Sequence, residues 1–187
     1  MAAPTRAEFD VDNEHPAARF AADCALQHDV CKSLLAVADS LPRSLEPEAV
    51  RLFLNVVPST WSAHVAFLDG VVFPLIQQRY ENHTSLHSRF TRLKQQHIEI
   101  SGANDELIDC LETAARGEPI DRGLLGYVIR YAAERRREHV EWERTLLGPM
   151  FPKTLTPVER KIFAEWVAAN PWPFVGLNLS GAGHIDS

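Results

Sequence analysis

Residues 121–149, DRGLLGYVIRYAAERRREHVEWERTLLGP, are typical of one long amphipathic helix. Asp121 is a suitable N-cap, and Pro149 interrupts the pattern. The run Arg135–Arg137 alternates with glutamates, and we expect it to form a solvated, ion-paired face. The expected buried stripe recurs at helical spacing and consists of Leu125, Val128, Ala132, Arg135, His139, Trp142 and Leu146. A histidine therefore lies on the apolar side of this predicted helix.

Three earlier segments show the same period, with no sustained alternation that would indicate strands. We expect helices over about 16–41, 47–80 and 84–116, with a kink or an irregular last turn at Pro74. Their expected stripes are Phe20, Cys24, His28, Cys31, Leu35 and Ala38; Phe53, Val57, Trp61, His64, Leu68, Val71 and Leu75; and Leu86, Phe90, Leu93, His97, Ile100, Leu107 and Leu111.

Short connections between these helices predict an all-α fold, an antiparallel up-down-up-down four-helix bundle. The bundle covers about 16–153 of a single domain, 1–187, and Gly117 ends its third helix. A short helix capped by Thr156 follows and leads into a tail, so that the C-terminal helix and tail cover about 156–187.

Composition narrows the classes of function. The chain has 187 residues, 45% of them hydrophobic, which suits one globular domain with a large core. A net charge of −6 disfavours nucleic acid as a partner. The N-terminus has no signal-peptide pattern, and apolar runs such as 71–76 are too short to span a membrane. Three cysteines without paired spacing are expected to be reduced, so we expect a cytoplasmic protein, with a homodimer as one possibility.

One histidine lies on each of the four predicted stripes, at positions 28, 64, 97 and 139. Counted from the connecting turns of an antiparallel bundle, their heights differ by less than about 8 Å. Clustered neutral imidazoles would lack hydrogen-bond donors, whereas a shared cation takes one nitrogen from each ring. Glu143, four residues after His139, and Asp69, five residues after His64, could add carboxylates. The pattern predicts a metal site within the bundle.

Several stretches resemble the hemerythrin-like (HHE cation-binding) domain family, over roughly residues 17–160. They are His139-x3-Glu143 followed by LLGPMFP at 146–152 and LTPVE at 155–159, His64-x4-Asp69 followed by VFPL at 72–75, LQH at 26–28 and QQH at 95–97. The resemblance implies a non-haem centre of two iron ions bridged by oxo and carboxylate groups. Its metal ligands would be His28, His64, Asp69, His97, His139 and Glu143, with zinc as a possible replacement for iron.

The chain departs from the family at Leu68, where a glutamate usually follows the second-helix histidine by four residues. A missing bridging carboxylate would favour one metal ion, zinc or no metal. His83 and His87 share one helical face and resemble the paired histidines of oxygen carriers. They lie next to a turn, some 18 Å from the His64 layer, and we expect a polar helix start instead.

The family resemblance implies a protein that binds or senses oxygen, redox state or iron, with oxygen, peroxide or nitric oxide as the small ligand. An alternative is an enzyme that acts on peroxide or nitric oxide or repairs iron centres. A third alternative is a zinc-stabilised or metal-free interaction bundle. No nucleotide-binding or hydrolase motif is present, and we identify no catalytic residue beyond the expected ligands.

Overall fold

The computed structural model describes residues 15–41 and 45–171, which are helical apart from short connections and contain no strand. The all-α prediction is confirmed for this part of the chain, whereas the expected tail after residue 171 lies outside it. The elements are α2 (Pro16–Ser40), α3 (Pro47–Phe67), the π-helix η1 (Leu68–Val72), α4 (Phe73–Arg79), α5 (Thr84–Ala115), α6 (Arg122–Leu147), the 3₁₀-helix η2 (Gly148–Met150) and α7 (Pro157–Ala169).

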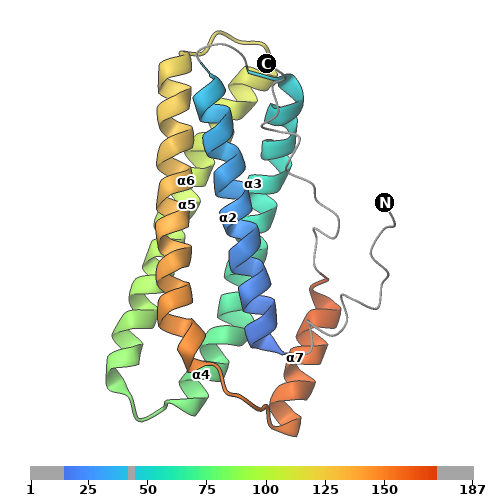
Figure 1. The fold of residues 1–187 in the computed structure, drawn as a ribbon, viewed down its shortest axis with the longest axis vertical. Coiled ribbons are helices and arrows are strands. Elements are labelled where there is room, and N and C mark those ends of the chain that lie inside the picture. Colours follow the sequence, from blue (N-terminus) through green and yellow to red (C-terminus); the bar gives the residue numbers. More distant parts are fainter. Residues whose placement is uncertain (1–14, 42–44, 172–187) are drawn as a thin grey trace.

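Four long helical segments lie side by side along the molecule (Figure 1). Helix α2 packs against α3 and α6, and α5 packs against the same two helices. Each long helix thus has two long neighbours, and their buried sides face one interior. The short helix α7 lies near one end, where it contacts η1.

Helix ends follow the expected local chemistry. The Asp121 side chain accepts hydrogen bonds from the backbone N–H groups of Gly123 and Leu124. Thr156 and Glu159 form a capping box at the start of α7. Gly117 has φ +72°, the left-handed conformation that suits glycine after the end of α5. These contacts satisfy backbone groups that helix termini leave unpaired, and they set the helix lengths.

The expected stripes of the second and third helices are buried throughout, whereas those of the first and fourth are buried only in part. His28 is only partly buried, and Asp23 and Gln27 turn inward instead. On α6, Arg135 is exposed and Arg136 is 1% exposed. The prediction that Arg136 belongs to a solvated face is therefore wrong. Its guanidinium finds buried acceptors on α2 and α3, which a reading of α6 alone could not reveal.

The irregular turn expected near Pro74 is the π-helical segment η1. In it the backbone N–H of Phe73 bonds to the carbonyl of Leu68, five residues earlier. Pro74 has no backbone N–H and cannot make the usual helical hydrogen bond. The wider turn before it accommodates this missing donor. The segment turns Leu68, Val71 and Val72 inward and leaves Asp69 at the surface.

The continuous stretch Pro47–Arg79 is long and apolar enough, by those two criteria alone, to cross a membrane. In its most apolar window 56% is buried inside the protein. Burial of this extent is what a core helix of a helical bundle shows, and the helix supplies much of the apolar interior.

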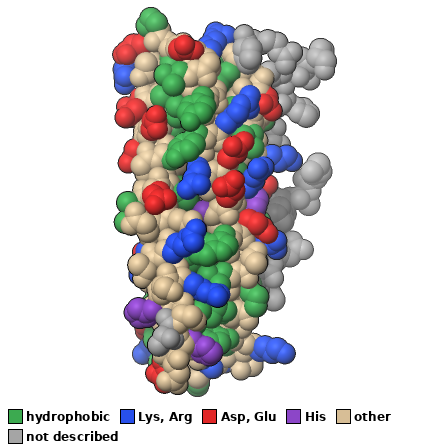
Figure 2. Space-filling model, turned by 90° about the vertical axis from the view of Figure 1, so that its left-hand side faces the viewer, with side chains coloured by type: hydrophobic (Ala, Val, Ile, Leu, Met, Phe, Trp, Pro, Cys, Tyr) green, Lys and Arg blue, Asp and Glu red, His purple; other side chains and the backbone are tan. Residues whose placement is uncertain are grey.

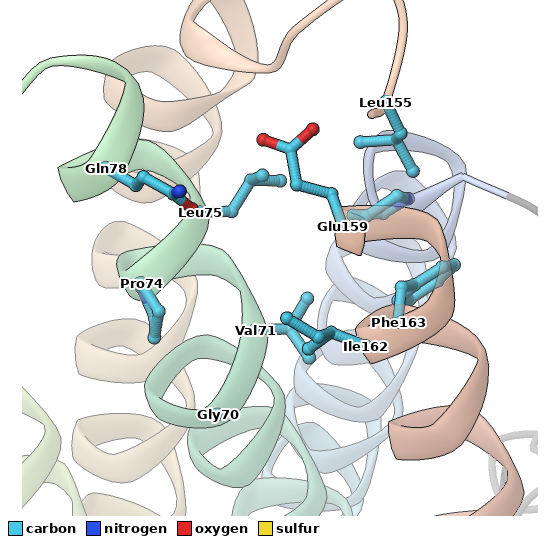
Figure 3. A pocket seen from close by; sticks show the side chains of 10 residues that line it. Gly70, Val71, Pro74, Leu75, Gln78, Leu155, Glu159, Ile162 and Phe163 are labelled. Carbon is cyan, nitrogen blue, oxygen red and sulfur yellow. The ribbon is translucent and has the colours of Figure 1, made fainter. Parts of the chain in front are cut away.

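Helix α7 also packs against the end of α3 through aromatic rings and against α4 through one ion pair. Phe163 is buried, and the Trp166 ring lies 5.3 Å from that of Phe67. Beside these contacts a narrow cleft of about 70 Å³ separates α7 from η1 and α4 (Figure 3). At its edge Arg79 Nε donates to Glu159 Oε1 at 2.7 Å.

Two glycines give opposite expectations for substitution by alanine. A Cβ at Gly70 would lie 2.7 Å from Trp166 Nε1, so Gly70→Ala should displace Trp166 and destabilise the protein by about 1–3 kcal/mol. Gly102, inside α5, has nothing within 4 Å of its added Cβ, so Gly102→Ala should stabilise the protein by about 0.5–1 kcal/mol. Chemical denaturation of both variants measures the difference, and equal effects would contradict the described docking of α7.

The Arg79–Glu159 pair predicts a pH dependence. Hydrogen bonds donated by Arg79 lower the pKa of Glu159 from an ordinary 4.5 to about 2. A carboxyl group with a depressed folded-state pKa stabilises the fold above pH 4.5, and this contribution is lost as the pH falls toward 2. Wild type should exceed Glu159→Gln in unfolding free energy above pH 5, and the gap should close by about pH 2 in urea titrations. A gap that does not change with pH would contradict the ion pair.

Candidate metal centre

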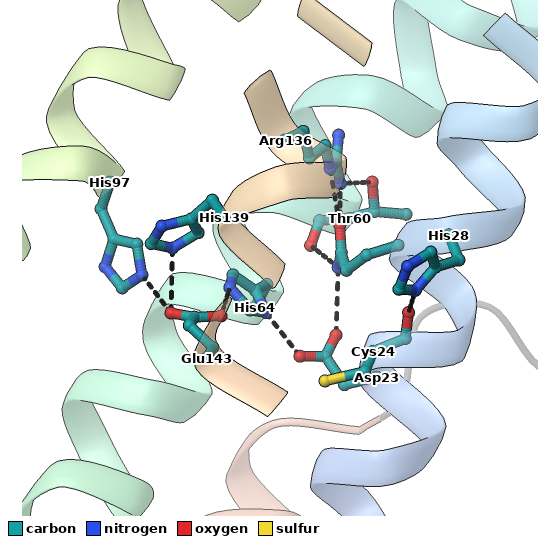
Figure 4. Close-up of polar contacts among 10 residues, drawn as sticks. Asp23, Cys24, His28, Thr60, His64, His97, Arg136, His139 and Glu143 are labelled. Carbon is teal, nitrogen blue, oxygen red and sulfur yellow. Dashed lines mark hydrogen bonds and ion pairs between the residues drawn. The ribbon is translucent and has the colours of Figure 1, made fainter. Parts of the chain in front are cut away.

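Three helices bring three histidines and one carboxylate together in the interior. His64 comes from α3, His97 from α5, and both His139 and Glu143 come from α6, one turn apart. One ligand atom from each of the four lies within 4.8 Å of the others, and all four side chains are buried. Figure 4 shows the three rings around the Glu143 carboxylate. We call this group the histidine–glutamate cluster.

Glu143 is the hub of the cluster. Its Oε1 lies 2.9 Å from His97 Nε2 and 2.9 Å from His139 Nε2. Its Oε2 lies 3.0 Å from His64 Nε2. All three imidazoles therefore present the same ring nitrogen, Nε2, to one carboxylate.

The hydrogen-bonding of these atoms tests whether a metal ion suits them. His64 Nε2, His139 Nε2 and Glu143 Oε2 are buried without a hydrogen-bond partner, although they lie within 3.0 Å of an oxygen or nitrogen of the cluster. The atoms are close, but their angles are not those of hydrogen bonds. Metal–ligand distances of 2.0–2.2 Å place neighbouring ligand atoms about 3–3.5 Å apart. The cluster could therefore hold a metal ion, and its donors do not decide which one.

Behind the cluster a second carboxylate contacts His64. Asp23 Oδ2 lies 2.6 Å from His64 Nδ1, and Asp23 Oδ1 accepts a hydrogen bond from Gln27 Nε2 at 3.0 Å. His139 has a comparable neighbour, because its Nδ1 lies 3.1 Å from Gln96 Oε1. Outer contacts of this kind orient metal-binding imidazoles in other proteins.

Aromatic rings enclose the histidines. The Trp61 ring stacks on His64, with centroids 4.9 Å apart, and the Phe73 ring lies 6.1 Å from His97. Trp61 is itself held by a hydrogen bond from Nε1 to Ser101 Oγ at 3.1 Å. The surroundings are apolar, and this strengthens every electrostatic interaction inside.

In the metal-free site, the charges of His64 and of the carboxylates Asp23 and Glu143 stabilise one another. Burial alone would lower the pKa of His64, but Asp23 and Glu143 outweigh it and raise the pKa to about 10. Burial alone would raise the pKa of Glu143, yet the His64 charge and the histidine contacts hold it well below its ordinary value. Burial lowers the pKa of His97. Arg136, with a pKa lowered by burial to about 10, keeps its charge at neutral pH.

Two of the six predicted ligands are not brought into the cluster. The His28 side chain is 38% exposed and its Nδ1 lies 2.9 Å from the Cys24 carbonyl, and the ring lies apart from the other three (Figure 4). It lines an open groove between α2 and α6. Asp69 is 44% exposed and pairs with Lys94 at 3.2 Å. In the turn Leu68–Val72 the buried side chain at the i+4 position from His64 is that of Leu68.

The inward-facing polar residues Asp23, Gln27 and Arg136 were not among the predicted site residues. The sequence does contain a signal for Asp23 and Gln27. They are four residues apart, so they share one face of the helix, and each directly precedes a residue of the expected stripe. Because Cys24 is buried as well, the buried face of α2 is wider than the expected stripe, and Asp23 and Gln27 extend it on one side. Nothing in α6 alone distinguishes Arg136 from its two arginine neighbours. His83 and His87 are exposed, in agreement with the expectation of a polar helix start.

Comparisons with known proteins add no assignment: no protein-family model, no curated protein and no solved structure matches the chain. The resemblance to the hemerythrin-like family therefore stays a prediction, and the site is interpreted from its own geometry.

Ligand substitutions separate the cluster from the excluded residues. His97→Ala and Glu143→Gln should each lose most metal binding, because each removes a donor from a group of four. Exposed His87, on the same helix as His97, provides the matched control His87→Ala. Zinc titrations with a competing chelator, after checking helical content by circular dichroism, give the affinities.

The same titration applied to His28→Ala and Asp69→Asn tests the placement of these two side chains. Both variants should keep the wild-type metal content, since neither residue reaches the cluster. Loss of an ion in either variant would mean that the residue turns inward when metal binds.

Proposed function

We propose that this protein is a non-haem metal-binding protein of hemerythrin-like type, an antiparallel four-helix bundle with one metal ion in its histidine–glutamate cluster. One observation carries the proposal: three Nε2 atoms and a carboxylate converge in a buried interior, where His97 Nε2 pairs with Glu143 Oε1 but His64 Nε2, His139 Nε2 and Glu143 Oε2 find no hydrogen-bond partner. Leaving such atoms unsatisfied is costly, and an ion that accepts all four donors removes that cost.

A single ion is favoured over the two irons that the family resemblance implies. A second ion would need further donors, and the two expected for it, His28 and Asp69, are partly exposed and lie outside the cluster. Asp23 is engaged by His64 and Gln27. The apolar Leu68 occupies the position from which the family supplies a bridging glutamate.

Iron is our first choice of metal, because imidazole and carboxylate together suit Fe(II). Iron would supply redox chemistry and an affinity for oxygen, peroxide or nitric oxide. In the cluster, Glu143 and the histidines would hold the ion, and Trp61 and Phe73 would exclude water. We propose binding or sensing of such a ligand, or of iron itself, as the role.

Binding is favoured over an enzymatic role on peroxide, nitric oxide or damaged iron centres. Turnover needs a proton donor near the bound ligand. The rings that contact the histidines belong to Trp61 and Phe73, and neither titrates near neutral pH. Asp23 is the nearby carboxylate, and His64 lies between it and Glu143.

A zinc-stabilised bundle is the second candidate, and the closure of the site favours it. Structural zinc sites have four protein ligands and no open position. The cluster provides four donors, and their residues are 0–4% exposed. In that case the ion would contribute to folding, and the surface of the bundle would carry the function.

The proposed partners are small molecules, in a cytoplasmic protein that binds neither nucleic acid nor membrane. The net charge of −6 supports this proposal, as does the mixture of acidic and basic side chains on the face shown in Figure 2. Homodimer formation stays a prediction.

Metal content and ligand binding test the proposal together. Protein produced separately with added iron and with added zinc, and purified without oxygen, should carry one ion per chain by elemental analysis. The reduced iron form should give a stable nitric oxide adduct, followed by absorption and electron paramagnetic resonance. Two irons per chain would contradict the single-ion proposal. Retention of zinc against excess iron, with no adduct, would favour the structural alternative.

A further inference from the structure

Helix α2 donates no ligand to the cluster, yet a buried polar chain connects it to His64. The chain runs from Arg136 on α6 through Gln27 and Asp23 on α2 to His64 on α3 (Figure 4). Arg136, Gln27 and Asp23 are only 1–2% exposed. A buried polar group destabilises the fold unless it has hydrogen-bond partners, and each of these three side chains has them.

The orientation of Gln27 is fixed by Arg136. Arg136 Nε donates to Gln27 Oε1 at 2.7 Å, and a guanidinium has no acceptor, so the amide oxygen must face it. Arg136 Nη2 also donates to Thr60 Oγ1 at 2.6 Å. The Gln27 amide nitrogen is thereby turned to Asp23 Oδ1 at 3.0 Å and to the Thr60 carbonyl at 3.2 Å.

Asp23 is fixed in turn and acts on His64. With Oδ1 held by Gln27, Oδ2 lies 2.6 Å from His64 Nδ1. A carboxylate only accepts, so Nδ1 carries the hydrogen and donates it. The other ring nitrogen, Nε2, then faces Glu143 Oε2 at 3.0 Å. A rotated or flipped ring would break one of these two contacts.

We propose that Asp23, held by Gln27 and Arg136, is the positioning residue of the metal centre. It orients the ring before the ion arrives, and when the ion takes the place of the Nε2 proton, it keeps the remaining hydrogen on Nδ1, so that the Nε2 lone pair faces the ion. This inference rests on the proposed function, because it assigns to α2 the outer contact of a metal ligand. Preorganised ligands bind more tightly than ligands that must be ordered on binding.

Asp23 variants test the acceptor and the charge separately. Asp23→Asn keeps one oxygen that can accept from Nδ1 but removes the charge and the acceptor for Gln27, and Asp23→Ala removes all of these. Zinc affinity, measured against a competing chelator, should fall about 10-fold in the first variant and about 100-fold in the second. Asp29, exposed on the same helix, provides the matched control Asp29→Asn, which should bind as wild type does.

A second readout reports the ring itself. In zinc-loaded wild type, nuclear magnetic resonance of ¹⁵N-histidine protein should show His64 with a downfield Nδ1–H, since this hydrogen is held by a carboxylate. The resonance should shift upfield in Asp23→Asn and be lost to exchange in Asp23→Ala. A merely structural role for Asp23 would change the unfolding temperature of the metal-free protein and leave both the zinc affinity and this resonance unchanged.

If the Asp23 variants do not fold, Gln27→Glu tests the same chain. A glutamate keeps an acceptor for Arg136 but has no N–H for Asp23, so zinc affinity should fall and the His64 resonance should shift. Wild-type affinity in folded Asp23→Ala, or in Gln27→Glu when the Asp23 variants do not fold, would overturn the inference. Failure of wild type to bind zinc or iron would overturn the proposed function instead, so the two failures are distinguishable.

Discussion

The Glu143 carboxylate is fully buried at the centre of the protein, and the arrangement around it follows from this constraint. A charge removed from water is costly unless opposite charges and hydrogen bonds replace the lost solvation. Here three imidazoles supply the replacement, and each is held by a different kind of neighbour: an acid for His64, an amide for His139 and an aromatic ring for His97. The core is therefore an organised set of charges inside an apolar shell.

The helices serve this arrangement unequally. Helix α6 provides both Glu143 and His139, whereas α3 and α5 provide one histidine each. Helix α2 balances the charge with Asp23 and accepts the buried cation Arg136 through Gln27. Phe67 of α3 and Phe163 of α7 belong to one apolar cluster, which also includes the buried residues of η1. Polar contacts thus fix which helix faces which, and apolar packing supplies most of the stabilisation.

Much of the fold could be predicted from the sequence, because helix periods and caps are local. The stripes of the second and third helices, the Asp121 and Thr156 caps and the stop at Gly117 needed only neighbouring residues. Three of the four clustered residues could be placed in one layer by counting from the turns. On the first helix Phe20, Cys24, Cys31 and Ala38 are buried as predicted, but Asp23 and Gln27 are buried beside them, and an apolar period cannot indicate buried polar residues. Arg136 depends on acceptors from other helices, and no local pattern reveals it.

The closed shell around the cluster has a consequence for kinetics. The four residues of the cluster are 0–4% exposed, so an ion would enter or leave while helices separate locally. Exchange then proceeds at the rate of such openings, far more slowly than diffusion to an open site. An ion bound during folding would then exchange slowly, and freshly purified protein would reflect the ions that were present when the chain was made.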